Sequence, residues 1–116
     1  DATTAEGKFL GGAIGPGLGT QERALADACP HLGAPAEEPC SGIPATTPDA
    51  VAEGSRTSLA LALDALSWAY EQDLPGGARR FLCGGDARLL IPWMSADWAY
   101  ADHLVLEGMS WLDHAS

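Results

Sequence analysis

The stretch Lys8-Phe-Leu-Gly-Gly-Ala-Ile-Gly-Pro-Gly-Leu18 decides the class of this fold. It is a short apolar run that is broken by Gly11-Gly12 and closed by Gly15-Pro16-Gly17. Glycine has no Cβ, so a second backbone or a ligand can approach the chain closely at these positions. Such glycines are unusual inside a buried strand. They indicate an α/β fold that handles a nucleotide or another substrate.

The residues on either side of this stretch predict a hairpin and a helix. Residues 9–14 read as a strand, paired with the residues before a hairpin turn at Glu6-Gly7. Residues 18–29 have apolar positions at helical spacing, and Pro30 ends that helix. Residues 30–46 contain four prolines and two glycines without periodicity, so we expect a long, flexible loop there.

A longer helix is expected from Thr47 to about Gln72. Thr47 suits the capping position, Pro48 suits the first helical position, and Asp49 favours the positive end of the helix dipole. One stripe of this helix is apolar and is expected to face the core. The stripe contains Val51, Leu59, Leu63, Leu66 and Tyr70.

The remaining residues alternate between strand and helix patterns. A short buried strand is expected at 79–83, a short helix interrupted by Pro92 at 87–94, a strand at 98–100 and a closing helix at 104–112. Alternating strands and helices predict an α/β layered architecture. The single-domain length of 116 residues is large enough for a modest core.

Composition and charge exclude several kinds of partner. The net charge of -10 repels nucleic-acid phosphates and anionic lipids, so we expect neither a nucleic acid nor a membrane as a partner. The three cysteines are an odd number, which favours reduced thiols in a cytoplasmic protein. Cys29, His31 and Cys40 match no zinc spacing, so no metal site is predicted.

Two places are candidates for ligand contacts. Gly84-Gly85 follow a predicted strand, where bare backbone lets a flat ligand lie at the carboxyl edge of a sheet, although the next residue, Asp86, equally suits a helix cap. Thr47 stands at the start of the longest helix, where free amides favour a carboxylate, although helix capping alone also explains it. Residues 15–20 match neither phosphate-loop pattern, because no Lys follows and Pro16 lacks an amide donor.

Four segments, taken in order, resemble the C-terminal half of a type III pantothenate kinase of the proteobacterial kind. Residues 6–18 resemble the family's "D-G-x-x-L-G-G-x-I-x-P-G-L/M", and residues 46–54 are similar to "N/S-T-V-E-A-x-x-x-G". Residues 81–86 are similar to its "T-G-G" adenosine loop, and residues 102–109 resemble its closing "D-L-x-L-x-G-L". The order and the intervals agree over nearly the whole chain.

The resemblance implies an actin-like, ribonuclease-H-like fold of two duplicated halves with ATP in the cleft between them. Residues 1–116 form the second half in this interpretation, and the N-terminal half is absent from the chain. The implied reaction is ATP-dependent phosphorylation of pantothenate to 4'-phosphopantothenate, the first step of coenzyme A biosynthesis. The family resemblance also implies a homodimer that uses Mg²⁺ and a monovalent cation, K⁺ or NH4⁺.

The resemblance also assigns roles to residues. It implies that Thr47 binds pantothenate across the dimer interface, that Gly84 and Gly85 lie beside the adenosine, and that Gly11 and Gly12 are nucleotide-binding. In the family, the catalytic Asp, the first phosphate loop and the cation-binding segment all precede this region. No catalytic residue is therefore expected in this segment, and we expect the segment to be inactive alone.

The chain departs from the family pattern at two places. Residues 44–46, Pro-Ala-Thr, stand where the family often has Gly-Arg-Asn, and the missing Arg weakens the local positive field. Cys83 replaces a frequent Thr. Two other interpretations remain open at this point. One is a non-catalytic relative that acts as a regulatory or protein-binding module, and the other is an unrelated nucleotide-binding α/β domain.

Overall fold

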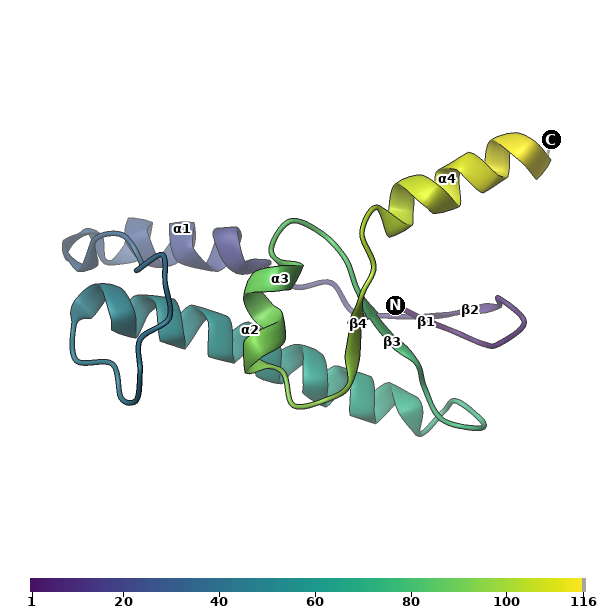
Figure 1. Ribbon diagram of the computed structural model, residues 1–116, viewed down its shortest axis with the longest axis horizontal. Coiled ribbons are helices and arrows are strands. Elements are labelled where there is room, and N and C mark those ends of the chain that lie inside the picture. The colour runs from purple at the N-terminus through teal and green to yellow at the C-terminus, as the bar shows by residue number, and fades with distance from the viewer. Residues whose placement is uncertain (116) are drawn as a thin grey trace.

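The computed structural model describes residues 1–115 and places side chains through Leu112 (Figure 1). Strands and helices alternate along most of the chain, so the predicted α/β class is compatible with the structure. The elements are β1 (Ala2–Thr3), β2 (Phe9–Gly11), α1 (Leu18–Ala28), the 3-10 turn η1 (Pro30–Leu32), α2 (Thr47–Glu71), β3 (Arg80–Leu82), α3 (Ala87–Leu90), the 3-10 turn η2 (Ile91–Trp93), β4 (Trp98–Tyr100) and α4 (Leu104–Ala115).

The strands form two separate pairs. β1 and β2 are antiparallel, as predicted, and the Gly7 N–H donates to the Thr4 carbonyl at 2.9 Å to close their turn. β2 ends at Gly11, earlier than predicted, because Gly11 adopts a φ of 127° that breaks the extended conformation. Ile14, expected inside the strand, is fully exposed.

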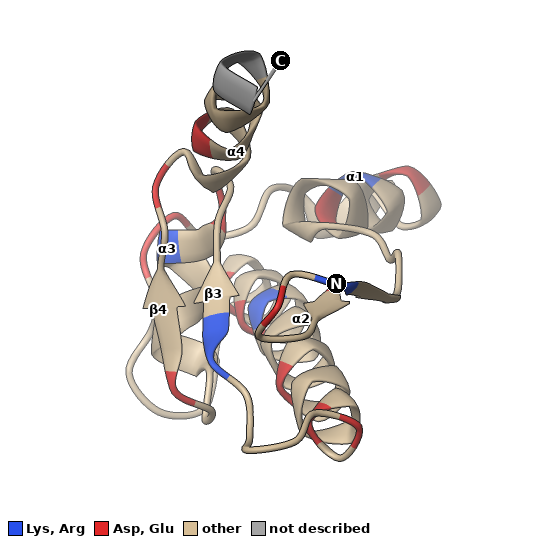
Figure 2. Ribbon diagram, turned by 90° about the vertical axis from the view of Figure 1, so that its right-hand side faces the viewer, with Lys and Arg blue, Asp and Glu red and all other residues tan. Residues whose placement is uncertain are grey.

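β3 and β4 form a parallel pair, with Arg80 opposite Trp98 and Leu82 opposite Tyr100. Their positions agree with the predicted strands. The expectation that residues 79–83 are buried is wrong, because Phe81 is 45% exposed and Cys83 is exposed. In both views β3 lies between β4 and the β1–β2 hairpin (Figures 1 and 2). Within the described residues, however, no ladder of backbone hydrogen bonds joins the two strand pairs.

The long helix α2 carries most of the core. Its buried residues include Ala52, Arg56, Ala60 and Asp64, which are four residues apart and therefore form one ridge along the helix. The predicted stripe is only partly right: Val51 is buried, Leu66 is exposed, and the other three members are half-buried. Small residues on the ridge let α1 and α3 approach α2. These two helices contribute the buried residues Leu18, Ala87 and Leu90 to the core.

The start of α2 differs from the prediction by one position. Thr46, not Thr47, is the capping residue: its Oγ1 accepts a hydrogen bond from the Asp49 N–H at 3.3 Å. The Thr46 hydroxyl also donates to the Asp49 carboxylate at 2.6 Å, which holds the hydroxyl oxygen in its capping position. Thr47 is the first helical residue, and its hydroxyl makes no hydrogen bond within the described residues.

The loop between α1 and α2 has one 3-10 turn, η1, and no other helix or strand. It is anchored near its middle, because the Ala36 N–H donates to the Pro48 carbonyl at 2.9 Å. Arg56 Nη2 donates to the carbonyls of Ala36 and Glu37, each at 3.0 Å. The flexibility of this loop stays a prediction. No helix within residues 1–115 is long and apolar enough to span a bilayer.

Candidate functional site

A hollow of about 310 Å³ lies at the carboxyl ends of β3 and β4. Because the two strands are parallel, the segments that follow them leave the sheet at the same edge, where ligands bind in many α/β folds. The hollow contains both predicted adenosine-loop glycines. Its lining residues are Cys83, Gly84, Gly85, Tyr100, Asp102, His103, Leu104, Val105 and Leu106.

Gly84 and Gly85 give the hollow a bare backbone wall. Gly84 has a φ of 104°, a conformation that side-chain-bearing residues rarely adopt. Apart from the glycine itself and its two chain neighbours, no residue has a heavy atom within 4 Å of the place where a Cβ would stand at either position. A flat ring could therefore approach this wall without meeting a side chain, which is the arrangement the sequence predicts.

Three polar side chains come to the same hollow from β4 and the turn after it. The Tyr100 hydroxyl donates to Asp102 Oδ1 at 3.2 Å, and His103 Nε2 lies 3.5 Å from the same oxygen. His103 has a φ of 54°, which is uncommon for a residue other than glycine and is found at ligand-contacting turns. His103 was not singled out in the sequence analysis. Its place directly after a strand end was the available signal.

Gly11 and Gly12 lie outside this hollow. Gly12 has a structural reason to be glycine, since a Cβ there would stand 2.6 Å from Asp1 Oδ1 and 2.8 Å from Asp1 Cα. The close approach that the sequence predicts is therefore made, within this chain, by the Asp1 backbone. Around Gly11 the space is open.

Thr47 lies far from the glycine wall within one chain. α2 begins at the outer end of the molecule, beside the end of α1, whereas the turn between β3 and α3 lies near its middle (Figure 1). Thr47 is exposed, and it lines neither of the two hollows described here. The structure therefore does not bring the two predicted binding places together in a single copy.

A second hollow, of about 360 Å³, lies between α1, α2 and α3. Its most unusual member is Arg56, which is only 5% exposed and has no carboxylate within 4 Å among the described residues. The guanidinium stacks on the Trp93 ring at 5.4 Å from the ring centroid, and its Nε has no hydrogen-bond partner. This hollow is also lined by Glu22, Glu37 and Asp86, so side chains of both charges contribute to its electrostatic field.

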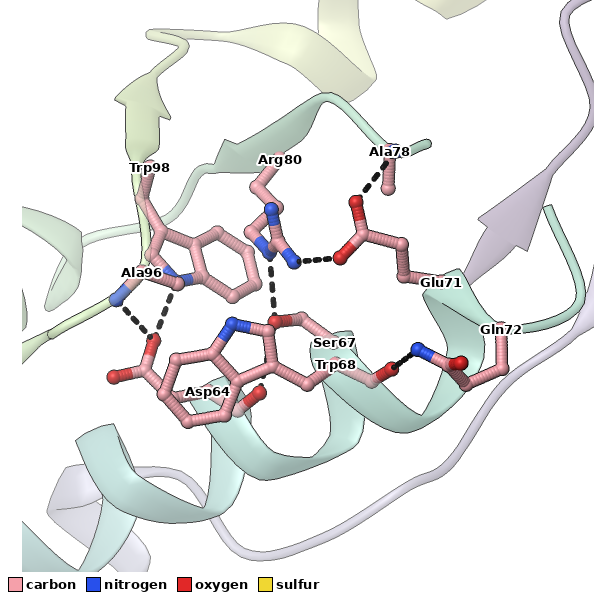
Figure 3. A network of polar contacts seen from close by, with 9 residues as sticks. All are labelled: Asp64, Ser67, Trp68, Glu71, Gln72, Ala78, Arg80, Ala96 and Trp98. Atoms are coloured by element: carbon pink, nitrogen blue, oxygen red, sulfur yellow. Dashed lines mark hydrogen bonds and ion pairs between the residues drawn. The ribbon is translucent and has the colours of Figure 1, made fainter. Parts of the chain in front are cut away.

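A buried carboxylate fixes the segment that leads into β4 (Figure 3). Asp64 is fully buried and accepts hydrogen bonds from the Ser95 N–H at 2.6 Å, the Ala96 N–H at 3.3 Å and Trp98 Nε1 at 2.7 Å. This network holds β4 against α2 and so positions the carboxyl end of the sheet. Sequence reasoning missed Asp64, although its four-residue spacing from Ala60 places it on the buried ridge.

A second polar network holds the start of β3 (Figure 3). Arg80 donates from Nε to Ser67 Oγ at 2.8 Å and from Nη2 to Glu71 Oε2 at 2.7 Å. The Ala78 N–H donates to Glu71 Oε1 at 3.0 Å. The hydrogen bond from Ala78, followed by that from Arg80, lowers the pKa of Glu71 below its ordinary value of 4.5.

The described residues contain no group of three metal-ligating side chains. All three cysteines are free thiols, and only Cys83 is exposed. Asp86 occupies the N-cap position of α3, as the capping interpretation expects, but its side chain makes no capping hydrogen bond. Asp86 instead lines the second hollow.

No family model matches the sequence. Individual proteins do: a type III pantothenate kinase of Chromobacterium violaceum is 38% identical over 110 residues, which are 94% of this chain and 46% of the relative. One from Laribacter hongkongensis is 34% identical over all of this chain and 48% of its own length. The chain is related to type III pantothenate kinases. It spans about half the length of the curated relatives it matches.

The relation to type III pantothenate kinases confirms the resemblance predicted from the four segments. A further relative, from Alkalilimnicola ehrlichii, is 37% identical over 119 aligned residues, covering 100% of this chain and 47% of the relative. The segments that carry the resemblance include the wall of the first hollow and the start of α2. The two candidate places therefore both lie within the region that these kinases share with this chain.

Proposed function

We propose that this chain is the C-terminal half of an ATP-dependent pantothenate kinase that forms 4'-phosphopantothenate in the first step of coenzyme A biosynthesis. The observation that carries the proposal is the bare Gly84-Gly85 wall, which lies at the carboxyl edge of a parallel strand pair in a chain related to these kinases. The proposed fold is the second of two duplicated halves of the actin-like, ribonuclease-H-like class. The hairpin, the long helix and the parallel pair are compatible with it.

The adenosine of ATP is proposed to bind in the hollow beside Gly84 and Gly85. A purine is flat and apolar on both faces, and a backbone wall without Cβ atoms accepts it at close range. Tyr100, Asp102 and His103 supply hydrogen-bonding groups at the rim of the hollow. Gly11 and Gly12 lie outside this hollow, so their proposed nucleotide contacts require the complete kinase.

Thr47 is proposed to act across the interface of a homodimer. There it binds the carboxylate of the pantothenate molecule that the partner subunit holds. Because Thr46 caps the helix, the Thr47 hydroxyl is available, and it lies in the first turn, where free amides and the dipole favour an anion. The separation of Thr47 from the glycine wall supports a site shared between two copies (Figure 1). The dimer and its cytoplasmic location are part of the proposal.

Phosphoryl transfer requires a base for the substrate hydroxyl, a phosphate cradle and cations that neutralise charge. We propose that the remaining half of the kinase supplies the base and the phosphate cradle, and that Mg²⁺ and K⁺ or NH4⁺ serve the reaction. No residue of this chain is assigned to a cation, since residues 1–115 hold no group of metal ligands. The chain alone is expected to show no turnover.

The test uses titration calorimetry with a nonhydrolysable ATP analogue and, separately, pantothenate. The protein is this chain fused to the remaining segment of the Chromobacterium violaceum relative. Gly85→Val should weaken nucleotide binding by about tenfold or more, because it fills the open wall. Gly15→Val is the matched control, since Gly15 also faces open space. Equal nucleotide affinity in both variants would contradict the adenosine assignment.

The same fusion tests the pantothenate assignment and the alternative function. Thr47→Val should weaken pantothenate binding, because valine keeps the shape of threonine and removes the hydroxyl. Binding of both ligands without phosphorylation by an otherwise complete kinase would favour the alternative of a non-catalytic relative. The proline and alanine at residues 44 and 45, where the family often has Gly-Arg, are the feature that favours that alternative.

A further inference from the structure

The carboxyl edge of the parallel strand pair places an acidic residue beside the glycine wall. Both strands point toward the turn that precedes α4 (Figure 2). Leu82 pairs with Tyr100, and the Ala101 N–H donates to the Leu82 carbonyl at 2.9 Å, so the pairing continues past β4. Gly84 and Asp102 each stand two residues after the end of their strand, and both line the hollow. Because neighbouring strands run about 4.8 Å apart, one nucleoside can contact both residues.

The Asp102 carboxylate is held at one oxygen and open at the other. Its Oδ1 accepts a hydrogen bond from the Tyr100 hydroxyl at 3.2 Å and lies 3.5 Å from His103 Nε2. Its Oδ2 makes no hydrogen bond within the part of the chain that the structure describes, and 57% of the side chain is exposed. The chain therefore fixes one carboxylate oxygen and leaves the other to accept hydrogen bonds from a ligand.

The tyrosine that holds Asp102 is itself held by a cation. The Arg88 guanidinium lies over the Tyr100 ring, 4.6 Å from the ring centroid. Arg88 belongs to α3 and does not line the hollow, so it contacts the ring from outside the proposed nucleotide site. A cation on an aromatic face restricts the ring, and this contact keeps the Tyr100 hydroxyl directed at Asp102.

We propose that Asp102 is a specificity-determining residue that accepts hydrogen bonds from the ribose hydroxyls of the nucleotide, and that Tyr100 positions its carboxylate. This inference rests on the proposed function. A carboxylate accepts hydrogen bonds and donates none, and a ribose offers two neighbouring hydroxyl donors. In dinucleotide-binding folds, likewise, a glycine-rich turn follows one parallel strand and an acidic side chain farther along the chain binds the ribose.

The other parts of the nucleotide fit the Asp102 carboxylate less well. The triphosphate is anionic, and a carboxylate beside it would repel it. The adenine ring is proposed to lie on the Gly84-Gly85 wall, and its exocyclic amine is the one donor group that competes with the ribose for Asp102. A nucleotide that lacks this amine separates the two possibilities.

The test measures nucleotide affinity by titration calorimetry on the fusion described above, without pantothenate, so that no phosphoryl acceptor is present. The ligands are ATP, 2',3'-dideoxy-ATP, which lacks both ribose hydroxyls, and ITP, whose base has a carbonyl in place of the amine. Asp102→Ala removes the carboxylate. Asp97→Ala is the matched control, since Asp97 is also exposed, precedes β4 and does not line the hollow.

We expect the parent fusion to bind ATP about tenfold more tightly than 2',3'-dideoxy-ATP and about as tightly as ITP, because hydrogen bonds to a charged group are strong. Asp102→Ala should lower the affinity for ATP about tenfold and change that for 2',3'-dideoxy-ATP less than about twofold. Asp97→Ala should change neither affinity by more than about twofold.

Tyr100→Phe tests the positioning role, since it removes the hydroxyl and keeps the ring beneath Arg88. This variant should lower the affinity for ATP less than Asp102→Ala does. In combination with Asp102→Ala it should have no further effect, because Tyr100 acts only through that carboxylate. An additional loss of ATP affinity in the double variant would overturn the positioning role.

Equal affinities of the parent fusion for ATP and 2',3'-dideoxy-ATP would overturn the ribose assignment. So would discrimination against ITP alone, since Asp102 would then bind the base, and so would an equal loss of both adenine nucleotides in Asp102→Ala. The proposed function fails separately. A fusion that discriminates between the two sugars through Asp102 but does not phosphorylate pantothenate supports the ribose assignment and contradicts the kinase assignment.

Discussion

The two ends of the parallel strand pair are built in opposite ways. On the α2 side, the buried Asp64 and the half-buried Arg80 and Glu71 make specific hydrogen bonds that hold β3 and β4 in place. At the carboxyl ends, a Cβ at Gly84 or Gly85 would face open space, and the apolar side chains of α4 through Leu112 are exposed. The contrast separates a region whose contacts are complete within the chain from one whose backbone wall and apolar side chains are open to solvent.

The largest effect on stability is expected on the α2 side of the strand pair, where the contacts are complete within the chain. Asp64→Ala leaves two backbone N–H groups and an indole N–H without their acceptor, and a buried donor without a partner costs about 1–3 kcal/mol. We expect the free energy of unfolding to fall by roughly 3 kcal/mol or more, measured by urea denaturation. The exposed Asp73→Ala is the control, and a loss below about 1 kcal/mol for Asp64→Ala would remove the distinction between the two regions.

A substitution of Arg56 tests whether the region whose contacts are complete within the chain extends to the loop before α2. Arg56→Met removes the hydrogen bonds to the carbonyls of Ala36 and Glu37 and the stacking on Trp93, at a cost of about 1–3 kcal/mol. Limited proteolysis within residues 33–45 should become faster than in the parent chain. An unchanged cleavage rate would show that other contacts hold this loop.

The glycine wall offers a matched pair of substitutions. Gly84→Ala forces a side chain into a φ of 104° and should cost about 1–2 kcal/mol. Gly85→Ala has open space and no positive φ, so its effect should stay within about 0.5 kcal/mol. Thermal unfolding of both variants measures the difference, and equal effects would mean that Gly84 can relax its backbone.

The smallest effect concerns pH. Hydrogen bonds from Ala78 and Arg80 lower the pKa of Glu71 in the folded chain, so its contribution to stability is complete above its ordinary value of 4.5 and is lost as the pH falls through the lowered value. Glu71→Gln should flatten the acid side of the stability profile slightly. The comparison uses urea midpoints between pH 3 and pH 6. An identical slope in the variant would show that the Arg80 contact does not couple to folding.

The sequence predicts elements better than it predicts contacts. The hairpin, α1, α2 and both strands of the parallel pair follow from local signals such as Pro30, the Thr-Pro-Asp run and the paired glycines. Thr46 and Thr47 both suit a helix start, and only the backbone shows that Thr46 caps. The ridge through Arg56 and Asp64 was missed because charged residues are expected outside, and their partners are 19 to 34 residues away.

The candidate site is predictable in part. Gly84 and Gly85 are identified by their place after a strand, and the structure lines a hollow with them. The sequence does not identify His103 and Asp102, because two polar residues before a helix are common on protein surfaces. The sequence also does not show why residue 12 is glycine. Its close neighbour is Asp1, eleven residues earlier, and no local pattern indicates that contact.

β3 has a ladder partner on only one side within the described residues. Its other edge presents unpaired amide and carbonyl groups beside the half-exposed Phe81. An open edge of this kind is a template for adding a strand from any neighbouring polypeptide. Concentrated solutions of the isolated chain are therefore expected to form β-rich aggregates slowly, and a short peptide that pairs with β3 should keep such solutions clear.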